Sequence, residues 1–228
     1  MEPMELNDIQ RASREQFGRQ SHRYGKGHIL EETQDIEAAL PALGLPVAAK
    51  VLDVATGGGH TGIFFARLGH TVTVSDIAQP MLDRAVNLGR KLGVTLSSQL
   101  HPAERMPYPD ASFDLVTCRV APHHFSAPQD FVAESARVLK PGAFFLLIDG
   151  TVADDEPEAE QWLHQIEILR DPSHHRLVTP KHWASMGQDV GLEIVSSEIY
   201  PKEQPDLEWY FEAADTPPEN RSRVRSLI

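Results

Sequence analysis

A glycine-rich turn that follows a short apolar run restricts the fold of this chain more than any other feature. Residues 51–62 read VLDVATGGGHTG, in which Gly57, Gly59 and Gly62 fit the pattern G-x-G-x-x-G. The apolar run predicts a buried strand, and the residues after the glycines have a helical pattern. Glycines at such a junction let the backbone turn tightly and let a ligand lie against it, while the start of the helix supplies free N–H groups. The segment therefore predicts a strand–loop–helix unit that binds a ligand; a tight turn that binds nothing is the alternative.

Strand-like and helix-like segments alternate through residue 148. Short apolar or β-branched runs indicate strands, and apolar residues three or four positions apart indicate helices. The expected strands are 51–55, 71–75, 94–100, 113–118 and 143–148. The expected helices between them are 63–68, 80–92 and 129–139, the last of them opened by a capping box of Ser126 and Gln129. Because the strands read as continuous apolar runs, we expect an α/β fold: a Rossmann-like, doubly wound, mostly parallel sheet with helices on both faces.

The composition argues against several functions. The 228 residues include 21 basic and 33 acidic side chains, a net charge of −12, which is unfavourable for binding a nucleic-acid backbone. The single cysteine, Cys118, excludes an internal disulfide and a thiolate zinc cluster, and no metal site is expected. The first 30 residues lack an apolar leader, and no stretch approaches the ~18 apolar residues of a membrane span. We therefore expect a cytoplasmic protein without stable insertion into a membrane.

Two acidic residues near the glycine turn narrow the choice of ligand. Asp76 ends the next expected strand, 19 residues after Gly57, where a carboxylate can accept hydrogen bonds from the two hydroxyl groups of a ribose. Asp53 lies within the first strand, four residues before Gly57. Its charge would repel the pyrophosphate of a dinucleotide and attract the ammonium group of S-adenosylmethionine (SAM). This favours SAM, with a dinucleotide such as NAD(P) as the alternative.

Four motifs taken together resemble a known family. They are VLDVATGGGH, VSDIAQPML, AERMPYPDASFDLVTC and ARVLKPGAFFLL, and they cover about residues 51–148. The combination is similar to the class I SAM-dependent methyltransferases, and within them to the group that includes the C-methyltransferases of ubiquinone and menaquinone biosynthesis. The resemblance implies a seven-stranded, mostly parallel sheet with the cofactor at the carboxyl ends of the strands. It also implies methyl transfer from SAM, which leaves S-adenosylhomocysteine (SAH).

The resemblance further implies roles for individual residues in holding the cofactor. The matching positions are Gly57, Gly58 and Gly59 for the loop beneath the methionine part, Asp53 for the amino group, Asp76 for the ribose, Ile77, Ala103 and Glu104 for the adenine, and Arg119 for the ammonium contact. One departure is at Pro102, where the family usually has an acid that accepts a hydrogen bond from the adenine amino group. Proline has no side-chain acceptor. Adenine recognition is therefore expected to depend on the Ala103 backbone, on Glu104 or on packing.

We expect residues 1–228 to form one methyltransferase domain, because a chain of this length with 41% hydrophobic residues can form a single core. Within it, 1–44 would be an N-terminal helical lid, 45–150 the cofactor-binding core and 151–191 a set of inserted helices over the substrate site. The expected helices outside the core are within 5–24, 31–43, 158–169 and 180–190, and a last one begins near 221.

The sequence defines the last strand of the sheet less well than the others. Leu192–Tyr200 has a strand-like pattern. The last antiparallel strand of the family is either missing here, or formed by 207–211 (LEWYF), or supplied by a partner chain. A homodimer would cover an edge that is otherwise open.

The methyl-acceptor side of the site has weaker signals. Methyl transfer mainly requires alignment of the nucleophile and exclusion of water, and it requires a general base only for an unactivated oxygen or carbon acid. His123 and His124, in the loop after the fourth expected strand, are the candidate catalytic residues because ligands bind at that edge of such a sheet. Tyr24, Arg170 and His174 are expected to contact the substrate. The alternatives for these residues are capping, packing and solvated roles.

We therefore predict an enzyme, a SAM-dependent methyltransferase that acts on a small, apolar or aromatic acceptor. The first alternative is an NAD(P)-dependent oxidoreductase, which Asp53 and the lack of a Tyr-x-x-x-Lys set disfavour. The second alternative is a SAM-binding protein without methyl-transfer activity.

Overall fold

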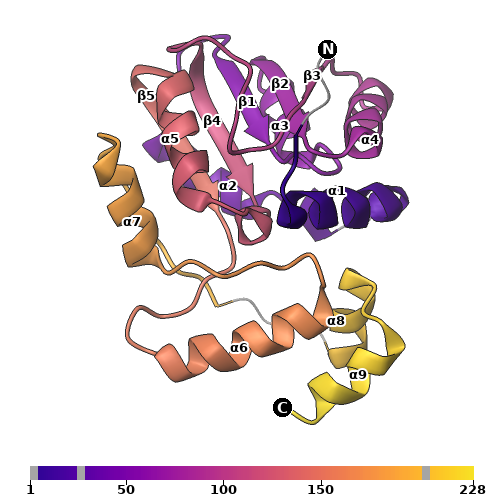
Figure 1. The fold of residues 1–228 in the computed structure, drawn as a ribbon. Coiled ribbons are helices and arrows are strands. Elements are labelled where there is room, and N and C mark those ends of the chain that lie inside the picture. The colour runs from indigo at the N-terminus through magenta and orange to yellow at the C-terminus, as the bar shows by residue number, and fades with distance from the viewer. Residues whose placement is uncertain (1–4, 25–28, 202–205) are drawn as a thin grey trace.

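The central sheet has five strands, and every neighbouring pair of strands runs parallel. The computed structural model describes residues 5–24, 29–201 and 206–228 (Figure 1). Within these ranges the strands are β1 (Lys50–Val54), β2 (Thr71–Asp76), β3 (Ser97–Leu100), β4 (Phe113–Arg119) and β5 (Leu139–Ile148). Their order is β3-β2-β1-β4-β5, so the chain direction across the sheet reverses between β1 and β4. The expected doubly wound parallel sheet is confirmed, whereas the seven strands that the resemblance implied are five in the described residues.

Two hydrophobic cores cover the two faces of this sheet. On one face, α3 (His60–Arg67) and α4 (Gln79–Lys91) pack against β1 and β2. On the other face, α5 (Pro128–Val138) packs against β1 and β4. Alternate residues of a strand point to opposite faces. Accordingly, Val51 of β1 belongs to the first core, and Leu52 and Val54 belong to the second.

The N-terminal part of the chain lies across one edge of the sheet. Helix α1 (Asp8–Gln20) begins at Asn7, whose side chain and that of Gln10 form a capping box. Helix α2 (Gln34–Ala39) follows, and short 3₁₀ turns occur at Ser21–Arg23, Ile29–Glu31, Leu40–Ala42 and Pro122–His124. In Figure 1, α1 lies between the sheet and a group of helices from the C-terminal part of the chain.

That C-terminal group has a core of its own. It consists of α6 (Pro157–Arg170), α8 (Leu207–Ala214) and α9 (Pro218–Arg225), which bury Ile166, Tyr210, Phe211 and Val224 together. Helix α7 (Pro180–Asp189) instead packs beside α5 (Figure 1), with Trp183 and Met186 against the sheet core. Within the described ranges, no helix is long and apolar enough to cross a membrane.

Two predictions about local structure, and one of the three alternatives for the last strand, are wrong. Leu192–Tyr200 forms no strand: Val195 and Ile199 are 67% and 64% exposed, and no hydrogen-bonded ladder includes them. Residues 207–211 belong to α8, because the Asp206 side chain caps the helix by accepting from the Trp209 amide. Ser126 does not cap α5; its hydroxyl donates to Glu104 instead. Within the described ranges, no antiparallel strand therefore joins β5.

Candidate active site

A pocket opens at the carboxyl ends of β1, β2 and β4, where the strand order reverses. The space inside it and at its mouth totals about 840 Å³. Loops after the strands form its floor, and residues of α1 and the segment after it form its roof. The predicted site residues that line it are Tyr24, Asp53, Gly57, Asp76, Ile77, Ala103, Glu104, Arg119 and His124. Ligands bind at this place in open α/β sheets.

Asp53 anchors the floor of the pocket. Its carboxylate is almost completely buried and accepts hydrogen bonds from the hydroxyl of Thr56, the hydroxyl of Thr117 (2.8 Å) and the amide of Gly62 (3.1 Å). These bonds join β1 to the glycine turn, to β4 and to the start of α3. Burial raises the pKa of Asp53 to about 6, although the three hydrogen bonds act in the opposite direction.

Asp76 lies at the end of β2 and also lines the pocket. One carboxylate oxygen accepts from the Gly57 amide at 3.0 Å and the other from the Ala78 amide at 2.9 Å. Burial raises the pKa of Asp76 to about 6, against the effect of these backbone donors. The Ile77 amide is a third backbone donor to this carboxylate, and the two oxygens together keep lone-pair capacity for a ligand.

Contacts with two different parts of the molecule exclude a side chain at the glycines of this segment. Gly57 has a φ of +53°, and a Cβ there would lie 3.4 Å from the Tyr24 ring. A Cβ on Gly58 would lie 2.9 Å from the Tyr24 carbonyl oxygen. In contrast, a Cβ on Gly59 would lie 2.7 Å from that of Ala85 in α4, and one on Gly62 would lie 2.6 Å from a methyl group of Val74. Gly59 therefore permits close packing against α4, and Gly62 permits close packing of α3 against β2. Of these four glycines only Gly57 lines the pocket.

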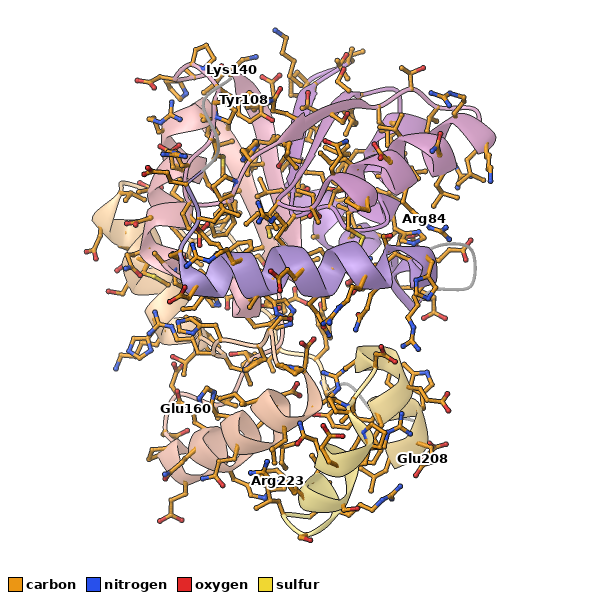
Figure 2. The ribbon with its side chains drawn as sticks, turned by 45° about the vertical axis from the view of Figure 1, so that its right-hand side comes forward. Arg84, Tyr108, Lys140, Glu160, Glu208 and Arg223 are labelled. Carbon is orange, nitrogen blue, oxygen red and sulfur yellow. The ribbon has the colours of Figure 1, made fainter. Side chains whose placement is uncertain are left out.

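The roof of the pocket is fastened to the rest of the molecule by polar side chains. Arg84 of α4 donates to the Tyr24 carbonyl oxygen at 2.5 Å, and Figure 2 shows Arg84 beside the end of α1. Arg119, at the end of β4, pairs with Asp35 at 2.7 Å and donates to the carbonyl oxygens of Leu30 and Glu32. The side chain of Arg119 is thus used to hold the N-terminal segment.

Further contacts connect α1 to distant parts of the chain. Gln10 donates to Glu104 at 2.9 Å, and Gln20 donates to the Ala214 carbonyl oxygen at 3.1 Å. Glu104 also accepts from the Ser126 amide and hydroxyl, so both of its oxygens are engaged. Glu104 therefore connects the roof to the loop before α5.

The end of the pocket beside Asp76 is mainly apolar. Ile77, Met81 and Ala103 line it, together with the imidazole of His101. His101 contacts the Pro102 carbonyl oxygen through Nδ1 (2.9 Å) and the hydroxyl of Tyr108 through Nε2 (3.2 Å). Sequence reasoning missed His101 as a pocket residue, although its position next to Pro102 was a usable signal.

The two adjacent histidines have different environments. His123 pairs through Nδ1 with Asp149 at 2.6 Å; burial alone would lower its pKa, but the Asp149 carboxylate outweighs burial and raises it. His124 lines the pocket, and burial, followed by the nearby charge of His123, lowers its pKa to about 3. The Phe17 ring packs edge-on against His124, with ring centres 4.8 Å apart. Only His124 of the two is placed to meet a ligand.

The other expected substrate contacts lie outside the pocket. Arg170 pairs with Glu167 at 2.9 Å and lies over the Tyr210 ring. His174 is buried behind His124, with ring centres 6.4 Å apart, and its Nε2 has no hydrogen-bond partner within the described ranges. Burial, then the charge of His123, lowers the pKa of His174 to about 3.

Comparisons with known proteins agree with this geometry. Residues 52–147 match the methyltransferase domain family. The chain is 33% identical over 171 residues to the uncharacterized methyltransferase YcgJ of Bacillus subtilis, covering 75% of this chain and 67% of that protein. The crystal structure of YcgJ is similar to this one with a TM-score of 0.77 at 28% identity, over 86% of this chain and 83% of that one.

Two further proteins support the same assignment. The structure of a candidate methyltransferase from Bacillus halodurans has a TM-score of 0.77 at 31% identity, over 84% of this chain and 82% of that one. The ubiquinone biosynthesis O-methyltransferase of Xanthomonas axonopodis pv. citri is 30% identical over 162 residues, or 68% of each chain. The chain belongs to the methyltransferase domain family, within the class I methyltransferases, and the resemblance of its motifs is confirmed.

Proposed function

We propose that the protein transfers a methyl group from SAM to a small, apolar or aromatic methyl acceptor and releases SAH. The observation that carries the proposal, beyond membership of the family, is the pocket floor with two buried carboxylates, Asp53 and Asp76. Negative charge at the floor favours a cationic ligand and disfavours one that carries phosphates. SAM carries an ammonium and a sulfonium and has no phosphate.

The residues of the pocket fit the parts of such a cofactor. Asp76 has free lone pairs for the ribose hydroxyls, and Gly57 exposes bare backbone in a left-handed conformation. The apolar surface of Ile77, Met81 and Ala103 suits an adenine ring. Asp53 supplies negative charge near the amino group without any need to release its own hydrogen bonds. When bound, SAM supplies a methyl group activated by a positively charged sulfur.

The protein itself contributes alignment and exclusion of water. We assign residues 1–44 as a lid, because Tyr24 and Phe17 cover the pocket, and 151–191 as the inserted helices behind it. His124 is the residue that would face the methyl acceptor. The apolar side chains of Phe17 and Phe125, which line the pocket together with His124, support an apolar or aromatic acceptor.

Substitution of Asp76 tests the proposal directly. Asp76→Asn removes the charge and places an NH₂ donor against the amide of Gly57 or Ala78, each of which donates to one carboxylate oxygen of the wild type. SAM and SAH should therefore bind about 10- to 100-fold more weakly, the usual effect of losing a charge-assisted hydrogen bond. Asp83→Asn is the matched control: Asp83 is exposed on α4 and bonds only to Gln79 in the described structure, so its change should leave affinity unaltered. Isothermal titration calorimetry gives both affinities.

The two alternative functions predict different results. A protein that binds NADH and neither SAM nor SAH would be an oxidoreductase, and the proposal would be wrong. Transfer of isotope-labelled methyl from SAM to a set of phenols, amines and thiols distinguishes an enzyme from a protein that only binds the cofactor.

A further inference from the structure

The loop that contains Asp171 and Ser173 lies far from His124 in the sequence but contacts one nitrogen of its imidazole ring. Nδ1 of His124 lies 3.0 Å from the carbonyl oxygen of Ser173 and 3.2 Å from its hydroxyl oxygen. The hydroxyl of Ser173 donates to Oδ1 of Asp171 at 2.7 Å, and the same oxygen accepts from the Ser173 amide at 2.9 Å. All three residues are buried.

The position of the imidazole hydrogen follows from these contacts. The Ser173 carbonyl oxygen can only accept a hydrogen bond. The Ser173 hydroxyl has one hydrogen, which it donates to Asp171, so towards His124 it also acts as an acceptor. Both neighbours of Nδ1 are acceptors, and Nδ1 therefore carries the hydrogen. Because a neutral imidazole has one N–H, Nε2 is left with a lone pair.

Nε2 of His124 is not among the fully buried polar atoms without a partner in the described structure, so it is accessible and not sealed in the core. His124 lines the pocket, whereas Asp171 and Ser173 do not. In the part of the chain that the structure describes, no hydrogen bond reaches Nε2 of His124. The edge-on ring of Phe17 restricts rotation of the imidazole.

We infer that Asp171 and Ser173 are positioning residues that fix His124 with an unprotonated Nε2 towards the pocket, so that the pocket selects methyl acceptors carrying an O–H or N–H group. The inference deepens the proposed function and rests on it for the identity of the reaction. A methyl acceptor with such a group satisfies Nε2. One without it leaves a buried acceptor atom unpaired, which weakens binding by about tenfold.

Nitrogen-15 NMR of protein labelled at histidine, with no cofactor added, tests the tautomer. His124→Gln identifies the His124 signals by their loss. The wild type should show one tautomer, protonated at Nδ1. In Asp171→Ala the Ser173 hydroxyl becomes free to donate to Nδ1, in competition with the Ser173 carbonyl oxygen, which still accepts from Nδ1–H. A second population, protonated at Nε2, should therefore appear beside the wild-type tautomer. Asp171→Asn keeps an oxygen for Ser173 and should keep the wild-type tautomer.

A binding experiment tests the selectivity. Phenol and anisole differ in having and lacking an O–H group on a similar ring. In protein saturated with SAH, phenol should bind about tenfold more tightly than anisole and shift the Nε2 signal, as expected for a gained hydrogen bond. His124→Phe should bind both equally.

Three results would overturn the inference: a wild-type His124 protonated at Nε2, an Asp171→Ala spectrum identical to the wild type, or equal binding of phenol and anisole. The wild-type spectrum decides the tautomer even if Asp171→Ala does not fold. Because that spectrum needs no cofactor, it is independent of whether SAM binds, and failure of the proposed function would appear separately in the calorimetry.

Discussion

Asp53 and Asp76 hold protons more tightly than exposed carboxyl groups do, because burial raises both pKa values to about 6. A bound cation would stabilise their ionised forms and lower both pKa values. Binding of SAM at pH 6 should therefore release on the order of one proton, and binding at pH 8 should release almost none from these groups. Calorimetry in buffers with different ionisation enthalpies measures this number. Proton uptake at pH 6, or equal release at both pH values, would contradict the expectation.

The positions of single residues near the glycine turn could be predicted from sequence because they follow from short separations along the chain. Asp53, Gly57 and Asp76 all line the pocket as expected. The partners of these residues could not be predicted. Thr117 reaches Asp53 from another strand, and Ser173 reaches His124 across 49 positions of sequence. No local pattern marks either contact.

At the scale of elements, the close packing of α3 against β2 can be tested by substitution of one glycine. Gly62→Ala places a Cβ 2.6 Å from Val74, between two packed elements, and should destabilise the protein by about 1–3 kcal/mol through overpacking. Gly18→Ala is the matched control, since Gly18 is also within a helix, α1, but a Cβ there meets nothing within 4 Å. It should stabilise the protein by about 0.5–1 kcal/mol. Denaturant unfolding of both variants measures the difference, and equal midpoints would disprove the packing argument.

Elements inside the sheet could be predicted because burial on both faces forces continuous apolar runs. The segment Leu192–Tyr200 has the right residue types but lies exposed, so its β-branched residues are no guide to pairing. Residues 207–211 include three aromatic side chains, which are typical of strands, yet Tyr210 and Phe211 pack on α6 and Asp206 caps a helix. Almost all of the first segment is exposed, and the second packs as a helix. In both cases the presence or absence of tertiary packing, and not β propensity, determines the structure.

For the whole molecule, buried histidines make stability depend on pH. The pKa of His174 falls from its ordinary 6.5 to about 3 in the folded chain, mainly through burial. Between pH 7 and pH 5 the unfolded chain gains a proton at this position that the folded chain does not, so acid favours unfolding. Asp53 and Asp76 act in the opposite direction, because their raised pKa values let the folded chain take up protons first.

A difference measurement separates these contributions. Between pH 7 and pH 5 the wild type should lose about 2 kcal/mol more stability than His174→Gln does, the value for one titrating group whose pKa is kept below this range by folding. Urea unfolding at the two pH values provides the comparison. If both proteins respond equally to pH, His174 is not a source of acid lability.

The contacts of α1 also determine when the pocket can exist during protein synthesis. Chains grow from the N-terminus, so residues 5–24 leave the ribosome before the residues that they contact. Their partners come much later: Glu104 is 94 positions away from Gln10, and Ala214 is 194 positions away from Gln20. Helix α1 therefore gains its contact with Glu104 first and its contact with Ala214 only after α8 has been made. A ribosome-bound chain that stops before α8 would have the sheet and the two carboxylates of the pocket floor. Its α1 would have the contact of Gln10 with Glu104 but not that of Gln20 with Ala214.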